Sequence, residues 1–336
     1  MEMVLAVLLF IAGFVCLIKG GDWFVDGSVG IAERFHLPEL LIGATIVSIG
    51  TTLPEVMVSA GSAISGHGQI AYGNAIGSVI CNTALISAIT FAVRPGPVER
   101  KSMIVPVIFF FVAAAIYCGT AYATGYFSRW IGIVFLVIFV VYVVINVMTV
   151  MRAPNAAAAE VLEEEVEEVE KAEKGSSLLM DIVKLVVGAA LIALGAKLLI
   201  DNGTKIAEAL GVPESVIALT FVALGTSLPE LVTAITSLAK GHSALSIGNV
   251  IGANLFNLVL VSGLSVTLNP FSIPDGSMIA GRNASLVLDL PVMMFVMAFM
   301  TIPALIRGKL SRYQGIILLL IYAAYCVIQF LCKDPQ

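Results

Sequence analysis

The sequence Gly50-Thr51-Thr52-Leu53-Pro54-Glu55 has a second copy, Gly225-Thr226-Ser227-Leu228-Pro229-Glu230, 175 positions later. Each copy places a carboxylate and a proline inside an otherwise apolar run. A charge in hydrocarbon costs roughly 2.5–3.5 kcal/mol even on the more lenient insertion scales, so it is normally retained for a functional site. Because proline lacks an N–H and clashes with the carbonyl four residues back, backbone oxygens near Gly50 and Gly225 should lack helical partners. Carboxylates, hydroxyls and freed carbonyls together predict an all-oxygen cage, which hard cations prefer.

The composition is that of a membrane protein. Of the 336 residues, 59% are hydrophobic and 12% are charged, whereas soluble domains average about 25% charged residues. The five cysteines are scattered through apolar segments without CxxC spacing, which favours buried, unpaired thiols. Ten apolar runs are long enough to cross a bilayer. They fall near residues 3–19, 38–63, 69–93, 102–121, 129–150, 178–200, 213–238, 244–268, 284–306 and 313–332.

The two halves of the chain are copies of each other. At the same offset of 175, Asp26 matches Asp201 and Gly73-Asn74 matches Gly248-Asn249. Five is an odd number of spans, so the second copy must enter the membrane from the opposite side. We therefore expect an all-α integral membrane fold of ten transmembrane helices, arranged as two inverted-topology five-helix repeats with broken helices at the midplane. The expected units are a first repeat over residues 1–150, an acidic linker over 151–177 and a second repeat over 178–336.

Loop charges predict the orientation. Twelve lysines and arginines, beginning with Lys19, are assigned to one side and five to the other, so the first side and the linker should be cytoplasmic and both termini outside. The linker has eight glutamates between positions 160 and 173. This pattern is typical of a solvated helical spacer. A cation-sensing role is the alternative, although no EF-hand ligand pattern is present.

Polar residues on the next span extend the predicted site. Asn74, Ser78 and Asn82 are four residues apart and so share one helical face, and the second repeat places Asn249, Ala253 and Asn257 on the matching face. Hydrogen bonding between helices and support of the site are both open interpretations for Asn74 and Asn249.

The two glutamates require a positive partner. Because the repeats offer no intramembrane lysine or arginine to pair with Glu55 and Glu230, we expect a transported cation or proton there. Two carboxylates carry a charge of −2, which one Ca²⁺ neutralises and which monovalent ions neutralise only in groups. Such a site suits exchange of one divalent ion for several monovalent ions, and three Na⁺ for one Ca²⁺ would be electrogenic.

Other classes of function fit the sequence less well. Proton coupling needs only carboxylates, and the hydroxyls around the glutamates favour sodium. An intramembrane hydrolase would need a nucleophile with a base, but the three histidines, His36, His67 and His242, are expected in loops. A primary pump would need a phosphate-binding loop, and no such motif occurs. A channel shares the polar lining but passes current without an opposing gradient. We expect a transporter that is not an enzyme and has no cofactor.

At the paired GT(T/S)LPE and GN(A/V)IG(S/A) motifs the chain resembles the cation/calcium exchanger superfamily, particularly the prokaryotic sodium/calcium exchangers. The resemblance covers nearly the whole chain. It implies a sodium/calcium antiporter of a prokaryotic plasma membrane. We predict that it works by alternating access, with the first and sixth spans sliding or rocking against the core, which is compatible with the resemblance and is not shown by it. A proton-coupled or potassium-dependent antiporter of the same fold is the alternative. The implied partners are Ca²⁺, Na⁺ and the lipid bilayer, without nucleic acid, and a monomer is sufficient.

The resemblance also assigns residues. It implies calcium coordination by Glu55 and Glu230, with the Thr51 and Thr226 carbonyls binding calcium and their oxygens binding sodium. The implied outlying sodium-site positions are Thr52, Ser78, Ser227 and the carbonyls of Ser48 and Ala223. The implied central asparagine is Asn82, and its repeat equivalent is Asn257. Two departures stand out: Ala253 replaces a serine that the family often has, and Asn257 replaces an aspartate, which disfavours potassium co-transport.

Overall fold

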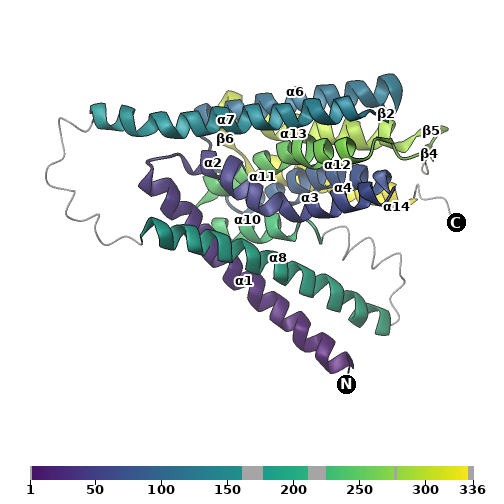
Figure 1. Cartoon of the computed structure of the whole chain (residues 1–336), viewed down its shortest axis with the longest axis horizontal. Helices are drawn as coiled ribbons and strands as arrows, with labels where there is room; N and C mark the ends of the chain where they lie inside the picture. Colours follow the sequence, from purple (N-terminus) through teal and green to yellow (C-terminus); the bar gives the residue numbers. More distant parts are fainter. Residues whose placement is uncertain (1, 161–176, 211–224, 276–277, 332–336) are drawn as a thin grey trace.

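A computed structural model describes residues 2–160, 177–210, 225–275 and 278–331, and the chain in it is a helical membrane protein (Figure 1). Within these residues, nine helical segments are long and apolar enough to cross a membrane. The seventh of the ten predicted spans, near 213–238, is described only from residue 225 onward. The prediction of an all-α membrane fold with about ten spans is confirmed.

The helices of the first half match five predicted spans. In chain order they are α1 (Glu2–Arg34), α2 (Glu39–Ile42), the π-helix η1 (Gly43–Val47), α3 (Ser48–Ile64), α4 (Gly68–Cys81), the π-helix η2 (Asn82–Ser87), α5 (Ala88–Val93), α6 (Arg100–Thr124) and α7 (Arg129–Glu160). Helix α7 therefore continues into the segment predicted as a linker. The rest of that linker, 161–176, lies outside the described residues.

The second half repeats this order. Its described helices are α8 (Leu178–Ala209), α10 (Leu228–Lys240), α11 (Ser243–Phe256), the π-helix η6 (Asn257–Val261), α12 (Ser262–Leu268), the π-helix η7 (Ser285–Asp289), α13 (Leu290–Arg307) and α14 (Arg312–Leu331). The sequence offset persists in the backbone, because η2 begins at Asn82 and η6 begins at its equivalent, Asn257.

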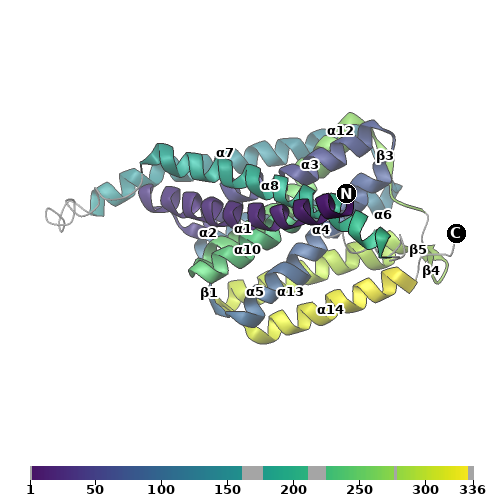
Figure 2. The same cartoon turned by 90° about the horizontal axis from the view of Figure 1, so that it is seen from below.

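Two-residue strands join the halves in a symmetric way. Strand β1 (Gly96–Pro97) pairs with β6 (Lys309–Leu310), and β2 (Tyr126–Phe127) pairs with β3 (Phe271–Ser272); a third pair joins β4 (Met278–Ile279) to β5 (Arg282–Asn283). Strand β3 follows β1 by the repeat offset, so exchanging the halves converts one inter-half pair into the other. The two pairs lie at opposite ends of α6 (Figure 2), as an inverted repeat requires.

Helix α1 is longer than the predicted span over 3–19, because it continues to Arg34. A helix of 33 residues measures about 50 Å, longer than the roughly 30 Å hydrocarbon core. Its charged second half is satisfied by protein: Lys240 contacts Asp22 and Asp26. The assignment of Lys19 to a loop is therefore wrong, because Lys19 lies within this helix.

The interruption of the helices differs between the repeats. In the second repeat a turn over 225–227 precedes α10, which begins at Leu228 with Pro229 in its first turn, as the motif predicts. In the first repeat α3 runs through Pro54, and the irregular backbone lies about two to three turns earlier, in η1. Tyr142 donates a 2.7 Å hydrogen bond to the carbonyl of Ala44 in that π-helix. A lost helical hydrogen bond can thus be compensated from a neighbouring helix.

Helices α1 and α8 pack on each other as a pair that slopes away from the layer formed by α6 and α7 (Figure 1). Glycines make this contact close. A Cβ atom at Gly13 would lie 3.0 Å from the Gly195 carbonyl, and one at Gly20 would lie 2.9 Å from the Gly188 carbonyl. Small residues let two helix backbones approach in this way inside a membrane.

The α1–α8 contact can be tested at Gly20. A side chain there would meet the Ile192 backbone nitrogen at 2.8 Å, so Gly20→Val should force the helices apart and lower stability by about 1–3 kcal/mol. Thermal unfolding in detergent micelles measures the change. The control is Gly61→Val on α3, where an added Cβ meets nothing within 4 Å. Equal melting temperatures for the two variants would contradict the close contact.

Candidate cation site

The two motif glutamates lie together in the interior. Glu55 on α3 and Glu230 on α10 are both fully buried, and their carboxyl groups interact electrostatically. Among the described residues neither carboxylate forms an ion pair, and none of their four oxygens has a hydrogen-bond partner. Two carboxylates sharing one buried site cannot both stay ionised without a positive partner. The arrangement therefore requires a cation or a proton beside the two carboxylates.

Hydrogen bonds that cross between the repeats hold the two motifs in place. Thr51 donates to the amide oxygen of Asn249 at 3.1 Å. Its equivalent, Thr226, donates to the amide oxygen of Asn74, also at 3.1 Å. Each motif is thus fixed by the asparagine of the opposite half. Both asparagines therefore form hydrogen bonds between helices, and each of these bonds also holds a motif threonine.

Only the first repeat completes this network. The Asn74 side-chain nitrogen donates to the Ser59 hydroxyl at 2.8 Å. The residue equivalent to Ser59 is Ala234, and the Asn249 side-chain nitrogen is buried without a partner among the described residues. Ser59 was missed from the sequence because a search for identical pairs between the repeats passes over a serine that matches an alanine.

A second asymmetry involves the outlying hydroxyls. Ser227 lies 3.4 Å from Ser78, hydroxyl to hydroxyl. The equivalent pair would be Thr52 and Ala253, and the buried Thr52 hydroxyl has no partner in the described part of the chain. The departure noted at Ala253 therefore leaves one side of the site with one oxygen fewer than the other.

Asn82 and Asn257 open the two π-helices that follow α4 and α11. Both side chains are fully buried, and neither amide group has a hydrogen-bond partner among the residues described. Unsatisfied buried amides are rare, because each costs about 1–3 kcal/mol. The side-chain amide oxygens of both asparagines are consequently available to a cation in the interior.

The remaining predicted positions have different outcomes. The Ser48 hydroxyl donates to the Gly43 carbonyl at 2.6 Å and lies 3.0 Å from the Asn249 carbonyl, so it joins η1 to α11. The Ser48 carbonyl lies 3.5 Å from the Thr51 hydroxyl. Ala223 lies outside the described residues.

The candidate ligands around Glu55 and Glu230 are oxygen atoms, and only the two carboxyl groups among them can carry charge. Within the described residues, no three histidines, cysteines, aspartates or glutamates come together as a metal cluster. A transition-metal centre normally uses cysteine or histidine ligands, whereas Ca²⁺ and Na⁺ accept carboxylate, hydroxyl and amide oxygens. His242, one of the loop histidines, instead contacts Glu39 at 2.7 Å.

The inverted repeats and a buried, oxygen-lined acidic pair define an ion-coupled secondary transporter. The chain matches the sodium/calcium exchanger protein family over residues 5–148 and 180–331 and belongs to that family. It is 30% identical over 358 residues to the sodium/calcium exchanger MaX1 of Methanosarcina acetivorans, covering 96% of this chain and 98% of that protein. An uncharacterized membrane protein of Methanocaldococcus jannaschii is 33% identical over 329 residues, with 95% and 96% coverage.

Solved structures agree with this assignment. A structure of the sodium-calcium exchanger NCX_Mj, soaked with 2.5 mM Na⁺ and 10 mM Sr²⁺, superposes with a TM-score of 0.78 at 29% identity. The match covers 97% of this chain and 99% of that one. The similarity therefore extends over both repeats.

The asymmetric network makes a prediction about stability. Ala234→Ser should give the buried Asn249 nitrogen the partner that Ser59 gives Asn74, and so raise the free energy of unfolding by about 1 kcal/mol. Ser59→Ala should lower it by about 1 kcal/mol because it removes the nearer partner of the Asn74 nitrogen and leaves only the Glu55 carbonyl at 3.4 Å. Thermal unfolding in detergent gives both values. If both variants shift stability in the same direction, the proposed equivalence of positions 59 and 234 is wrong.

Proposed function

We propose that the protein exchanges Na⁺ for Ca²⁺ across the membrane by alternating access. The observation that carries the proposal is the pair of buried glutamates, Glu55 and Glu230, without an ion-pair partner in the described part of the chain. Membership of the sodium/calcium exchanger protein family supports the choice of ions. So does the similarity to proteins named as sodium/calcium exchangers.

Charge explains why the two ions compete. One Ca²⁺ balances the two carboxylates, whereas Na⁺ must enter in groups and needs additional oxygens for its extra ions. The hydroxyls near the glutamates supply such oxygens and favour sodium over protons as the coupling ion. If three Na⁺ replace one Ca²⁺, each cycle moves one net charge, so transport is electrogenic.

The ligands follow from the arrangement around the acidic pair. In this proposal Glu55 and Glu230 coordinate Ca²⁺ together with backbone oxygens of Thr51 and Thr226. Sodium occupies flanking positions that use the neutral oxygens. These positions are Thr52, Ser78, Ser227, Asn82, Asn257 and the carbonyls of Ser48 and Ala223.

Alternating access requires one part of the protein to move past another. The glycine-lined α1–α8 pair suits this role because its two helices pack closely on each other and so can move as a unit. Gly50, directly before the motif threonines, faces the ring of Phe24 on α1, with an added Cβ 3.1 Å from that ring. Movement of α1 would therefore alter the wall of the site.

The proposed orientation and membrane of the protein are based on its sequence. Loop charges favour cytoplasmic loops on the lysine- and arginine-rich side and both termini outside, and the resemblance to prokaryotic exchangers favours a prokaryotic plasma membrane. One chain carries both repeats and both glutamates, so a single copy holds a complete site.

The exchange is tested in proteoliposomes. At clamped pH an outward Na⁺ gradient should drive ⁴⁵Ca²⁺ uptake, and Glu55→Gln or Glu230→Gln should reduce it at least 100-fold, because one carboxylate cannot balance Ca²⁺. Glu99→Gln, at an exposed position before α6, is the matched control and should transport normally.

Each variant must first elute as a folded monodisperse protein. Sodium-driven uptake by folded Glu55→Gln protein would refute the role of the pair. Uptake that follows a pH gradient and ignores Na⁺ would assign the coupling to protons.

The missing hydroxyl at Ala253 predicts a gain in sodium binding. Ala253→Ser should restore the pair with Thr52 and lower the Na⁺ concentration for half-maximal exchange about fivefold, equivalent to roughly 1 kcal/mol. The measurement is the Na⁺ dependence of Ca²⁺ efflux. Ala113→Ser, at a fully buried position of α6, is the control for adding a hydroxyl. An equal shift in both variants would exclude a local effect at Thr52.

A further inference from the structure

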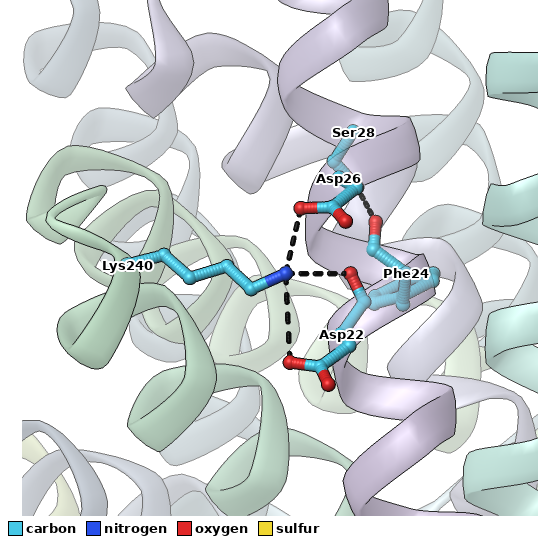
Figure 3. Close-up of polar contacts among 5 residues, drawn as sticks. All are labelled: Asp22, Phe24, Asp26, Ser28 and Lys240. Atoms are coloured by element: carbon cyan, nitrogen blue, oxygen red, sulfur yellow. Dashed lines mark hydrogen bonds and ion pairs between the residues drawn. The ribbon is translucent and has the colours of Figure 1, made fainter.

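Lys240 connects a site helix to the helix pair proposed to move. It ends α10, and its ammonium lies 2.6 Å from the Asp26 carboxylate on α1 (Figure 3). The same ammonium lies 3.1 Å from the backbone carbonyl of Asp22 and 3.5 Å from its carboxylate. The lysine thus reaches two acidic residues at once, with Asp26 the nearer.

The spacing of the two aspartates fits a helix that moves along its axis. Asp22 and Asp26 are four residues apart, so they lie on one face and about 6 Å apart along α1. A shift of α1 by a helical turn would carry one carboxylate away from Lys240 and bring the other into its place. Lys240 itself stays with α10, which also carries Glu230.

Side chains pack closely around this contact. The Thr236 hydroxyl, one turn before Lys240, and the Val232 side chain, two turns before it, lie so close to Gly21 that an added Cβ would meet them at 2.7 and 2.8 Å. Helix α1 therefore rests directly on α10 with a glycine at the point of contact. The ion pair adds a charged preference for axial position to this apolar packing.

Among the described residues, the equivalent positions of the repeat form no such ion pair between helices. At the repeat offset, Lys240 corresponds to Ser65, while Asp22 and Asp26 correspond to Lys197 and Asp201. Lys197 and Asp201 pair with each other at 3.9 Å within α8. An ion pair that has no counterpart at the repeat-related positions stabilises the two states of the transport cycle unequally.

We propose that Lys240 is a positioning residue that sets the axial position of α1 against α10, with Asp26 and Asp22 as alternative partners a helical turn apart. The inference rests on the proposed exchange function, in which α1 moves. Because the three side chains are partly exposed, each pair is weak and should change the balance of states by about two- to fivefold. Such a tie can be broken and remade in every cycle.

The test measures the position of α1 directly. Spin labels at the exposed positions Leu8 on α1 and Trp130 on α7, in a chain with its five native cysteines replaced, report the distance between α1 and the core in proteoliposomes. The labelled background must retain sodium-driven calcium uptake. We expect two distances whose populations depend on Na⁺.

The aspartates give the discriminating result. Asp26→Asn should favour the position held by Asp22, and Asp22→Asn should favour the position held by Asp26, so the populations should shift two- to fivefold in opposite directions. Lys240→Met should remove the preference, and Lys240→Arg should restore it. A purely structural ion pair would give shifts in the same direction for both aspartates.

Lys197→Met is the matched control, because it removes a lysine from a pair confined to α8, and it should leave the populations unchanged. A single distance, or populations that ignore Asp22, Asp26 and Lys240, would overturn the inference while leaving exchange intact. Loss of sodium-driven uptake in the unmodified protein would overturn the proposed function, and the distance measurement would still decide whether Lys240 positions α1.

Discussion

The structure depends on two acidic side chains buried where no lysine or arginine, among the residues described, balances them. An isolated carboxylate in a low-dielectric interior costs several kcal/mol, so the surrounding helices must provide compensation or accept a cation. The fold surrounds Glu55 and Glu230 with neutral oxygens and leaves all four carboxylate oxygens without a partner. The π-helices that begin at Asn82 and Asn257 add two buried amide groups that have no hydrogen-bond partner among the described residues.

The repeat made much of this predictable. A carboxylate inside an apolar run is a strong signal, and finding it twice at one offset identified Glu55 and Glu230 together with the inverted fold. The four-residue spacing of Asn74, Ser78 and Asn82 placed three polar side chains on one face of a helix. Hydropathy also found the spans that cross the bilayer, because their apolar runs are long.

Other features could not be predicted because they depend on contacts between distant segments. The length of α1 was underestimated because its charged second half is stabilised by Lys240, more than 200 residues away in the chain. Pro54 was expected to interrupt its helix, but α3 continues through it and the irregular turn lies in η1, where Tyr142 binds a backbone carbonyl. Ser59 was invisible to a comparison of the repeats because its counterpart is Ala234.

The strand pairs and the threonine–asparagine bonds have a consequence for how the chain is made. Strand β1 pairs with residues 309–310, and the hydrogen bond of Thr51 that crosses between the repeats needs Asn249. When the first five spans leave the ribosome, they therefore lack the groups that complete them. The amino-terminal half must wait in the bilayer, with a carboxylate in its interior, until nearly the whole polypeptide has been synthesised.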